Sequence, residues 1–175
     1  MKKLLTIGLS AAVLLGACGA EESAEPKEST TGSAASDEDS KEVKKELMKF
    51  YMSIPNTINA ADADLNAFEM NQAEGTLPEG EDLQTMKNAA IVSAKKSADA
   101  VETIEIPAAL EKKEEQIETA IAAIRESYKI KAEAVAKDAS FEAADKKFGE
   151  ADALLNELLV EQDLVASSIN NEVSQ

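Results

Sequence analysis

The fold is decided by residues 47–68, which read LMKFYMSIPNTINAADADLNAF. Apolar residues recur there at alternating steps of four and three, which places them along one face of an α-helix. They are Leu47, Tyr51, Ile54, Ile58, Ala61, Leu65 and Phe68. Pro55 lies inside the stretch, and a proline removes one backbone hydrogen bond and usually kinks a helix. Because the apolar spacing keeps its phase across Pro55, we predict one kinked helix over residues 41–72.

Three further helices are predicted from the same kind of spacing. A loop containing Gly and Pro, residues 73–80, separates the first helix from a second at 81–104, whose apolar face is built largely of alanine. Pro107 suits the first position of a third helix, which we place at 107–137. Two positions of its apolar stripe hold Glu114 and Lys131 instead of apolar residues.

A fourth helix is predicted at 140–172, with Val165 and Ile169 among its apolar positions. No Gly or Pro separates it from the third helix, so one long helix has to be considered. If the apolar stripe of the third helix continued along one long helix, it would bury four residues unsuited to a core, namely Asp138, Glu142, Asp145 and Gly149. The apolar stripe instead restarts out of phase at Phe141, and Asp138 or Ser140 suits the cap of a new helix. We therefore predict a turn at 138–140.

The four predicted helices have similar lengths and short connections, which favours antiparallel neighbours. Ala, Glu, Lys and Leu, all good helix formers, dominate the sequence of residues 41–175. We predict an all-α domain there, an antiparallel up-down four-helix bundle whose first helix is kinked at Pro55. A three-helix bundle, with residues 81–104 only loosely docked, is the alternative.

The N-terminus has the form of a secretory signal. Two lysines follow Met1, and an apolar run of about 12 residues extends from Leu4 to Leu15. The run is too short to cross a bilayer, which takes about 20 residues. We predict a signal peptide over residues 1–17.

The end of this run, Leu15-Gly16-Ala17-Cys18, holds the one cysteine of the chain. It resembles the lipobox of bacterial lipoprotein precursors: an aliphatic residue, two small residues and a cysteine. The resemblance implies lipid transfer to the Cys18 thiol, cleavage before Cys18, and anchoring by acyl chains on the extracytoplasmic face of the cell membrane. Two or more acyl chains are needed for stable anchoring. A free cysteine at the end of an ordinary signal peptide is the alternative.

Residues 18–40 follow as a stretch of Glu, Ser, Thr, Ala, Gly and Asp that lacks Leu, Ile, Val, Phe and Tyr. Such a segment buries too little apolar surface to offset its ordering entropy, so we predict a disordered acidic tether. Tethers of this kind resemble those of small helical lipoproteins from Gram-positive bacteria, some of which are labelled cell-wall binding.

The chain is strongly acidic, with a formal net charge of −16. Nucleic acid is excluded as a partner by this balance, because phosphate binding requires a cationic surface. Anionic lipid headgroups and anionic wall polymers should also repel the domain. A basic protein or a divalent cation is still a possible partner. The simpler interpretation is that the charged surface only keeps the domain soluble.

The chain lacks the side chains of several common active sites. It contains no His, so Ser-His-Asp and Cys-His arrangements are excluded, as are the common zinc sites. Its glycines do not form a phosphate-binding loop. We expect a protein that is not an enzyme and holds no cofactor or metal, with Cys18, the lipidation site, as the one nameable functional residue.

The segment Asp62-Ala63-Asp64-Leu65-Asn66 begins like the calcium-binding loop of an EF-hand. That loop needs Gly at its sixth place and a bidentate acid at its twelfth, where this chain has Ala67 and Ala73. We therefore expect Asp62 and Asp64 to lie on a solvated helix face.

We make two further predictions, one about the tyrosines and one about the asparagines. Tyr51 and Tyr128 fall on apolar stripes and are expected in the core with outward hydroxyls. The first helix is unusually rich in asparagine, which favours helices less than its neighbours do. Its asparagines are Asn56, Asn59, Asn66 and Asn71. If any helix presents a polar groove, we expect this one, near Pro55.

Two functions remain as hypotheses. The first is a non-catalytic, membrane-anchored extracytoplasmic lipoprotein that meets another protein or has a structural role at the cell surface. The second is a helical bundle that binds a small molecule or a divalent cation, for which the small side chains of the helix at 81–104 would leave room.

Overall fold

The computed structural model describes residues 33–173. Its α-helices are α1 (Ser33–Asn59), α2 (Ala63–Glu74), α3 (Gly80–Glu102), α4 (Glu114–Lys137), α5 (Glu142–Glu161) and α6 (Ile169–Val173), and a 3-10 helix, η1 (Ala108–Lys113), precedes α4. The described residues contain no strand, so the prediction of an all-α domain is confirmed. None of the helices in this range combines the length and apolarity needed to cross a membrane.

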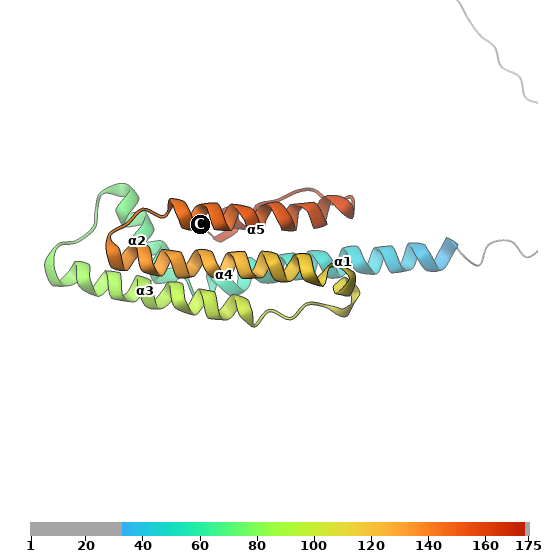
Figure 1. The fold of residues 1–175 in the computed structure, drawn as a ribbon, viewed down its shortest axis with the longest axis horizontal. Coiled ribbons are helices and arrows are strands. Elements are labelled where there is room, and N and C mark those ends of the chain that lie inside the picture. The colour runs from blue at the N-terminus through green and yellow to red at the C-terminus, as the bar shows by residue number, and fades with distance from the viewer. Residues whose placement is uncertain (1–32, 174–175) are drawn as a thin grey trace, which may run out of the picture. The chain divides into compact units, whose positions relative to one another are not determined.

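Helix α4 lies between α3 and α5 and packs against both along their length (Figure 1). Helix α2 packs on α3, and α1 contacts α3, η1 and the short α6. One hydrophobic core joins these elements. Its largest fully buried side chains are Tyr128, Phe68, Phe148, Ile54, Ile58, Leu65, Leu110, Ile117, Ile124, Leu155, Leu158 and Ile169.

Helix α3 is firmly part of this core. Ala90, Ala94 and Ala98 are at most 2% exposed, and Val101 is fully buried. Their small side chains allow close approach of the neighbouring helices, so the alternative of a loosely docked segment 81–104 is wrong.

The prediction of one kinked helix over 41–72 is also wrong. Helix α1 continues through Pro55 and ends at Asn59, and α2 begins at Ala63. The amides of Ala61 and Asp62 both donate to the Ile58 carbonyl oxygen, so the regular helical bonding stops there. The freed carbonyl of Ala61 accepts a hydrogen bond of 2.7 Å from Ser93 Oγ on α3. A tertiary contact therefore replaces the helical bond.

The predicted fourth helix, 140–172, is likewise interrupted. Helix α5 ends at Glu161, Asp163 adopts a left-handed conformation with φ 51°, and the amide of Leu164 donates back to the Leu159 carbonyl. Val165, expected in the core, is 89% exposed. Ile169 is fully buried as predicted, because it opens the separate helix α6.

The predicted turn at 138–140 is confirmed, although its residues act differently from the prediction. Asp138 adopts φ 53° at the end of α4, and the amide of Ala139 donates to the Ala134 carbonyl. Asp138 thus closes α4 instead of capping α5, which begins after Phe141.

At the N-terminal side, α1 begins at Ser33, inside the stretch 18–40 for which a disordered tether is predicted. Residues 33–40 contain no Gly or Pro, and Ala34, Ala35 and Glu38 favour a helix, so α1 extends beyond the predicted start at 41. The predicted signal peptide and Cys18 lie outside the described residues.

Candidate functional site

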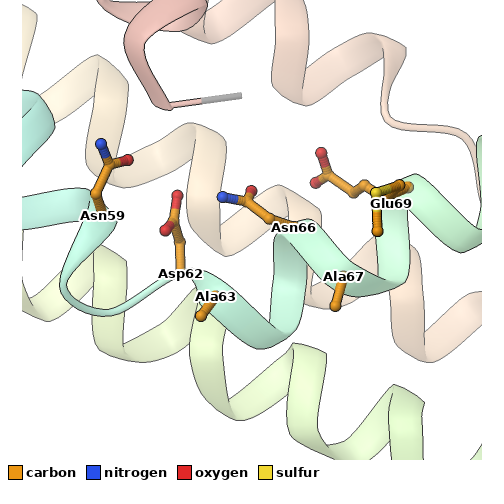
Figure 2. A pocket seen from close by; sticks show the side chains of 7 residues that line it. Asn59, Asp62, Ala63, Asn66, Ala67 and Glu69 are labelled. Atoms are coloured by element: carbon orange, nitrogen blue, oxygen red, sulfur yellow. The ribbon is translucent and has the colours of Figure 1, made fainter. Parts of the chain in front are cut away.

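A groove of about 650 Å³ follows the outer face of α2 (Figure 2). Helical spacing places its lining residues on the side of α2 opposite the buried Leu65 and Phe68. The lining residues are Asn59 at the end of α1, followed by Asp62, Ala63, Asn66, Ala67, Glu69 and Met70. The groove therefore combines polar side chains with an apolar bed.

Asp62 is the most buried polar residue of the groove. It is 1% exposed, so the expectation that Asp62 lies on a solvated face is wrong, whereas Asp64 is exposed as expected. The tertiary break between α1 and α2 turns Asp62 inward, and Tyr128 Oη donates to its Oδ2 over 3.4 Å. Burial raises the pKa of the Asp62 carboxyl, while hydrogen bonds from Asn66, its own backbone and Tyr128 oppose the rise.

A second carboxylate of the groove, Glu69, is neutralised within the protein. Lys131 Nζ on α4 lies 2.8 Å from Glu69 Oε1. The same ammonium lies 5.9 Å from the ring centroid of Tyr128 and 5.7 Å from that of Phe141. Among the described residues, Asp62 has no lysine or arginine within 4.0 Å. Asp62 is thus the one groove carboxylate without an ion pair.

Two asparagine amides connect the groove to the C-terminal helix. Asn59 Nδ2 donates to the Glu172 carbonyl over 3.1 Å, and Asn66 Nδ2 donates to the Val173 carbonyl over 3.0 Å. These carbonyls belong to the last turn of α6, where helical partners are lacking. The Asn66 amide also turns its nitrogen toward the Asp62 carboxylate (Figure 2). In Figure 2 the side chains of Asn59, Asp62 and Asn66 point to the same side of the chain.

Tyr128 lies beneath the groove, 2% exposed, with its ring edge toward Phe148 at a centroid distance of 6.1 Å. Burial raises its pKa, and the neighbouring charges of Asp62 and Glu69 act in the same direction. Core positions for Tyr51 and Tyr128 are confirmed. The hydroxyl of Tyr128, however, points inward to Asp62 instead of outward, because Asp62 itself is buried.

Part of this site is predictable from the sequence. Of the asparagines of the predicted first helix, Asn59 and Asn66 line the groove, which lies at the break between α1 and α2 and not at Pro55. Asn71 instead donates to the Ala67 carbonyl. The involvement of Lys131 was signalled by a charged residue on an apolar stripe, since Lys131 is only 8% exposed.

Within residues 33–173, no three acidic, cysteine or histidine side chains gather in a way that could hold a metal ion. Comparison with known protein families, with curated proteins and with solved structures found no match in any of the three.

Proposed function

We propose that the chain is a membrane-anchored extracytoplasmic lipoprotein, lipidated at Cys18, whose helical domain is a non-catalytic protein-interaction or structural module at the cell surface. The observation that carries the proposal is the sequence Leu15-Gly16-Ala17-Cys18 directly after a basic and apolar N-terminus. The net charge of −16 favours a basic surface on the protein partner.

We further propose that α1, α3, α4 and α5 form an antiparallel up-down four-helix bundle, with α2 and α6 as short additions. Support comes from the contacts of α4 with α3 and α5, and of α1 with α3. Spin labels at exposed positions near the two ends of α3 and α4 would test the direction of the helices. A short distance between the C-terminal end of α3 and the C-terminal end of α4 would contradict this arrangement.

The anchoring proposal is tested by Cys18→Ser in the native host, with Ser23→Ala as the matched control. We expect the wild type and Ser23→Ala to incorporate a labelled fatty acid and to sediment with membranes. Cys18→Ser should do neither. Fatty-acid labelling of Cys18→Ser equal to that of the wild type would refute lipidation at this residue.

The interaction role is tested separately by crosslinking at the surface of intact cells that carry the wild-type protein. We expect one protein to be recovered reproducibly with the wild type and to be lost with Cys18→Ser. Recovery of nothing above background would count against a protein-interaction module.

A second candidate function, binding of a small molecule or divalent cation, is favoured by the groove beside α2. A ligand that binds the folded state raises its melting temperature. A thermal-shift screen with divalent ions and small organic molecules is therefore the first test, and an unchanged melting temperature across the panel would argue against this function.

A further inference from the structure

We propose that the C-terminal segment, residues 162–173, is a releasable strap, and that the site it leaves on α1, α2 and α5 binds the same segment of a second copy. The strap consists of the linker after α5 and of helix α6. The proposal stands apart from the anchor at Cys18, because the strap and its site both belong to the helical domain. It names a binding site and its occupant.

The strap depends on the rest of the molecule for its structure. Helix α6 has five residues, whereas isolated helices shorter than about 12 residues are marginal in water. The linker to α5, residues 162–168, contains no helix, and Val165 in it is 89% exposed. The position of α6 is therefore fixed by the surface that receives it.

The N-terminal end of α6 is held by two side chains of α5. Asp152 Oδ1 accepts from the Ile169 amide over 2.9 Å, and its Oδ2 accepts from Ser168 Oγ over 2.7 Å. Asn156 Oδ1 accepts from the Ser167 amide over 2.8 Å. Two of these three bonds are made to the backbone of the strap, so they fix its path.

The C-terminal end of α6 is held in the same manner from α1 and α2. Asn59 Nδ2 donates to the Glu172 carbonyl, and Asn66 Nδ2 donates to the Val173 carbonyl. A helix cannot satisfy these terminal carbonyls by itself. Side chains of three other helices thus bind both ends of α6, as a protein binds a peptide.

Two apolar side chains fasten α6 between these polar contacts. Ile169 is fully buried and Val173 is 4% exposed, and their spacing of four places them on one face of α6. Both belong to the hydrophobic core, and α6 contacts α1 and α5. Release of α6 would therefore leave an apolar surface with polar side chains at both of its ends.

Tyr51 on α1 lies beneath the strap. It is 5% exposed, and burial raises the pKa of its hydroxyl. Ser167 of the strap opposes this rise in pKa, whereas the charges of Asp152 and Glu172 add to it. The surface under the strap thus belongs to the core and needs to be covered.

The same segment of a second copy makes the same contacts, which is the basis of domain swapping. A linker of seven residues spans at most about 25 Å when it is extended. Within one chain, a short linker gives the strap an effective concentration on the order of millimolar. The closed monomer therefore dominates, and exchange requires that the strap of the receiving copy be weakened.

The first experiment adds a fluorescent peptide with the sequence of residues 162–175 to the full-length chain. Ile169→Ser weakens the strap and leaves its site intact, so this variant should bind the peptide at least tenfold more tightly than the wild type does. Val165→Ser is the matched control in the exposed linker and should bind as weakly as the wild type. A peptide that itself carries Ile169→Ser should not bind.

The second experiment tests exchange between copies by analytical ultracentrifugation, with a reductant to prevent disulfides through Cys18. A chain with Asp152→Ala and Asn59→Ala keeps its strap but has an impaired site. Mixed with the Ile169→Ser chain, it should form a heterodimer, whereas each chain alone should stay monomeric. A mixture that stays monomeric would refute exchange between copies.

Hydrogen exchange of the wild type keeps the test decisive if Ile169→Ser does not fold. The Ile169 amide should exchange at least tenfold faster than the slowest amides of α4, because the strap opens without global unfolding. Exchange of this amide only through global unfolding would refute the releasable strap. The proposal also fails if folded Ile169→Ser shows no saturable binding of the peptide, or binds it no more tightly than the wild type.

Discussion

Lys131 and Glu69 form a largely buried ion pair between α4 and α2, with Nζ 2.8 Å from Oε1. Their side chains are 10% and 25% exposed, and the ammonium also faces the rings of Tyr128 and Phe141. The Lys131 ammonium compensates the negative charge of Glu69, so this charge is neutralised by the protein itself. The ion pair thereby holds the Glu69 side chain in place at the inner wall of the groove beside α2.

Lys131→Ala should lower the free energy of unfolding by about 2 kcal/mol, because it leaves Glu69 partly buried without its counter-ion. Lys137→Ala is the matched control, since Lys137 pairs with Glu133 on the exposed face of the same helix. That change should cost less than about 0.5 kcal/mol. Urea unfolding measures both values, and equal losses would contradict the stabilising role of the buried pair.

Asp62→Asn should change how stability depends on pH. Burial raises the pKa of Asp62 in the folded protein above its ordinary value of 3.8, so the folded state holds this proton more tightly than the unfolded state. The resulting stabilisation is fully present below 3.8 and is lost as pH rises through the raised value. The stability of the wild type relative to Asp62→Asn should therefore fall as pH rises above 3.8.

Urea unfolding of both proteins at several pH values checks this prediction. The neighbouring charged and titratable groups, Glu69, Tyr128 and Lys131, are present in both proteins, so the difference between the two reports on Asp62. Asp64→Asn serves as the control and should follow the pH profile of the wild type, because Asp64 is exposed. A difference between wild type and Asp62→Asn that stays constant with pH would exclude the expected linkage.

Ala94→Leu should destabilise the protein by about 2 kcal/mol. Ala94 is fully buried in α3, and a larger side chain there forces the packed helices apart. Ala136→Leu, at an exposed position of α4, adds the same atoms where there is room and should stay within about 0.5 kcal/mol of the wild type. Thermal or urea unfolding distinguishes the two, and a stabilised Ala94→Leu would mean that α3 packs less tightly than described.

Asp152→Ala should loosen the C-terminal segment without unfolding the core. Asp152 Oδ1 accepts from the Ile169 amide over 2.9 Å, and Oδ2 accepts from Ser168 Oγ over 2.7 Å, so Asp152 holds the start of α6. Hydrogen-exchange protection of α6 should fall by about 1 kcal/mol, the usual contribution of a helix cap. Glu150→Ala, which removes an exposed pair with Lys147, should leave this protection unchanged.

The helical class and much of the core were predictable because the apolar spacing is regular. Leu47, Ile54, Ile58, Leu65 and Phe68 are all at most 2% exposed, as their stripe indicates. The turn at 138–140 was predictable for the same reason, since a stripe that changes phase cannot continue on one helix.

The break after Asn59 could not be read from the sequence, because Ala60 and Ala61 are the best helix formers available. The Ala61 carbonyl in this break accepts a hydrogen bond from Ser93 Oγ, a contact between residues far apart in the chain. The burial of Asp62 follows from that break, so it could not be predicted from the local sequence either. Local sequence therefore predicted the helices, whereas the groove depends on tertiary contacts.

Helix α1 has a mechanical consequence. It is continuous from Ser33 to Asn59, exposed over residues 38–42 and embedded in the core from Leu47 onward. A pull along its axis would load all of its buried side chains at once, in shear against α3 and α6, instead of peeling them away one turn at a time. Helix α1 is thus placed to transmit tension into the core as a rigid rod.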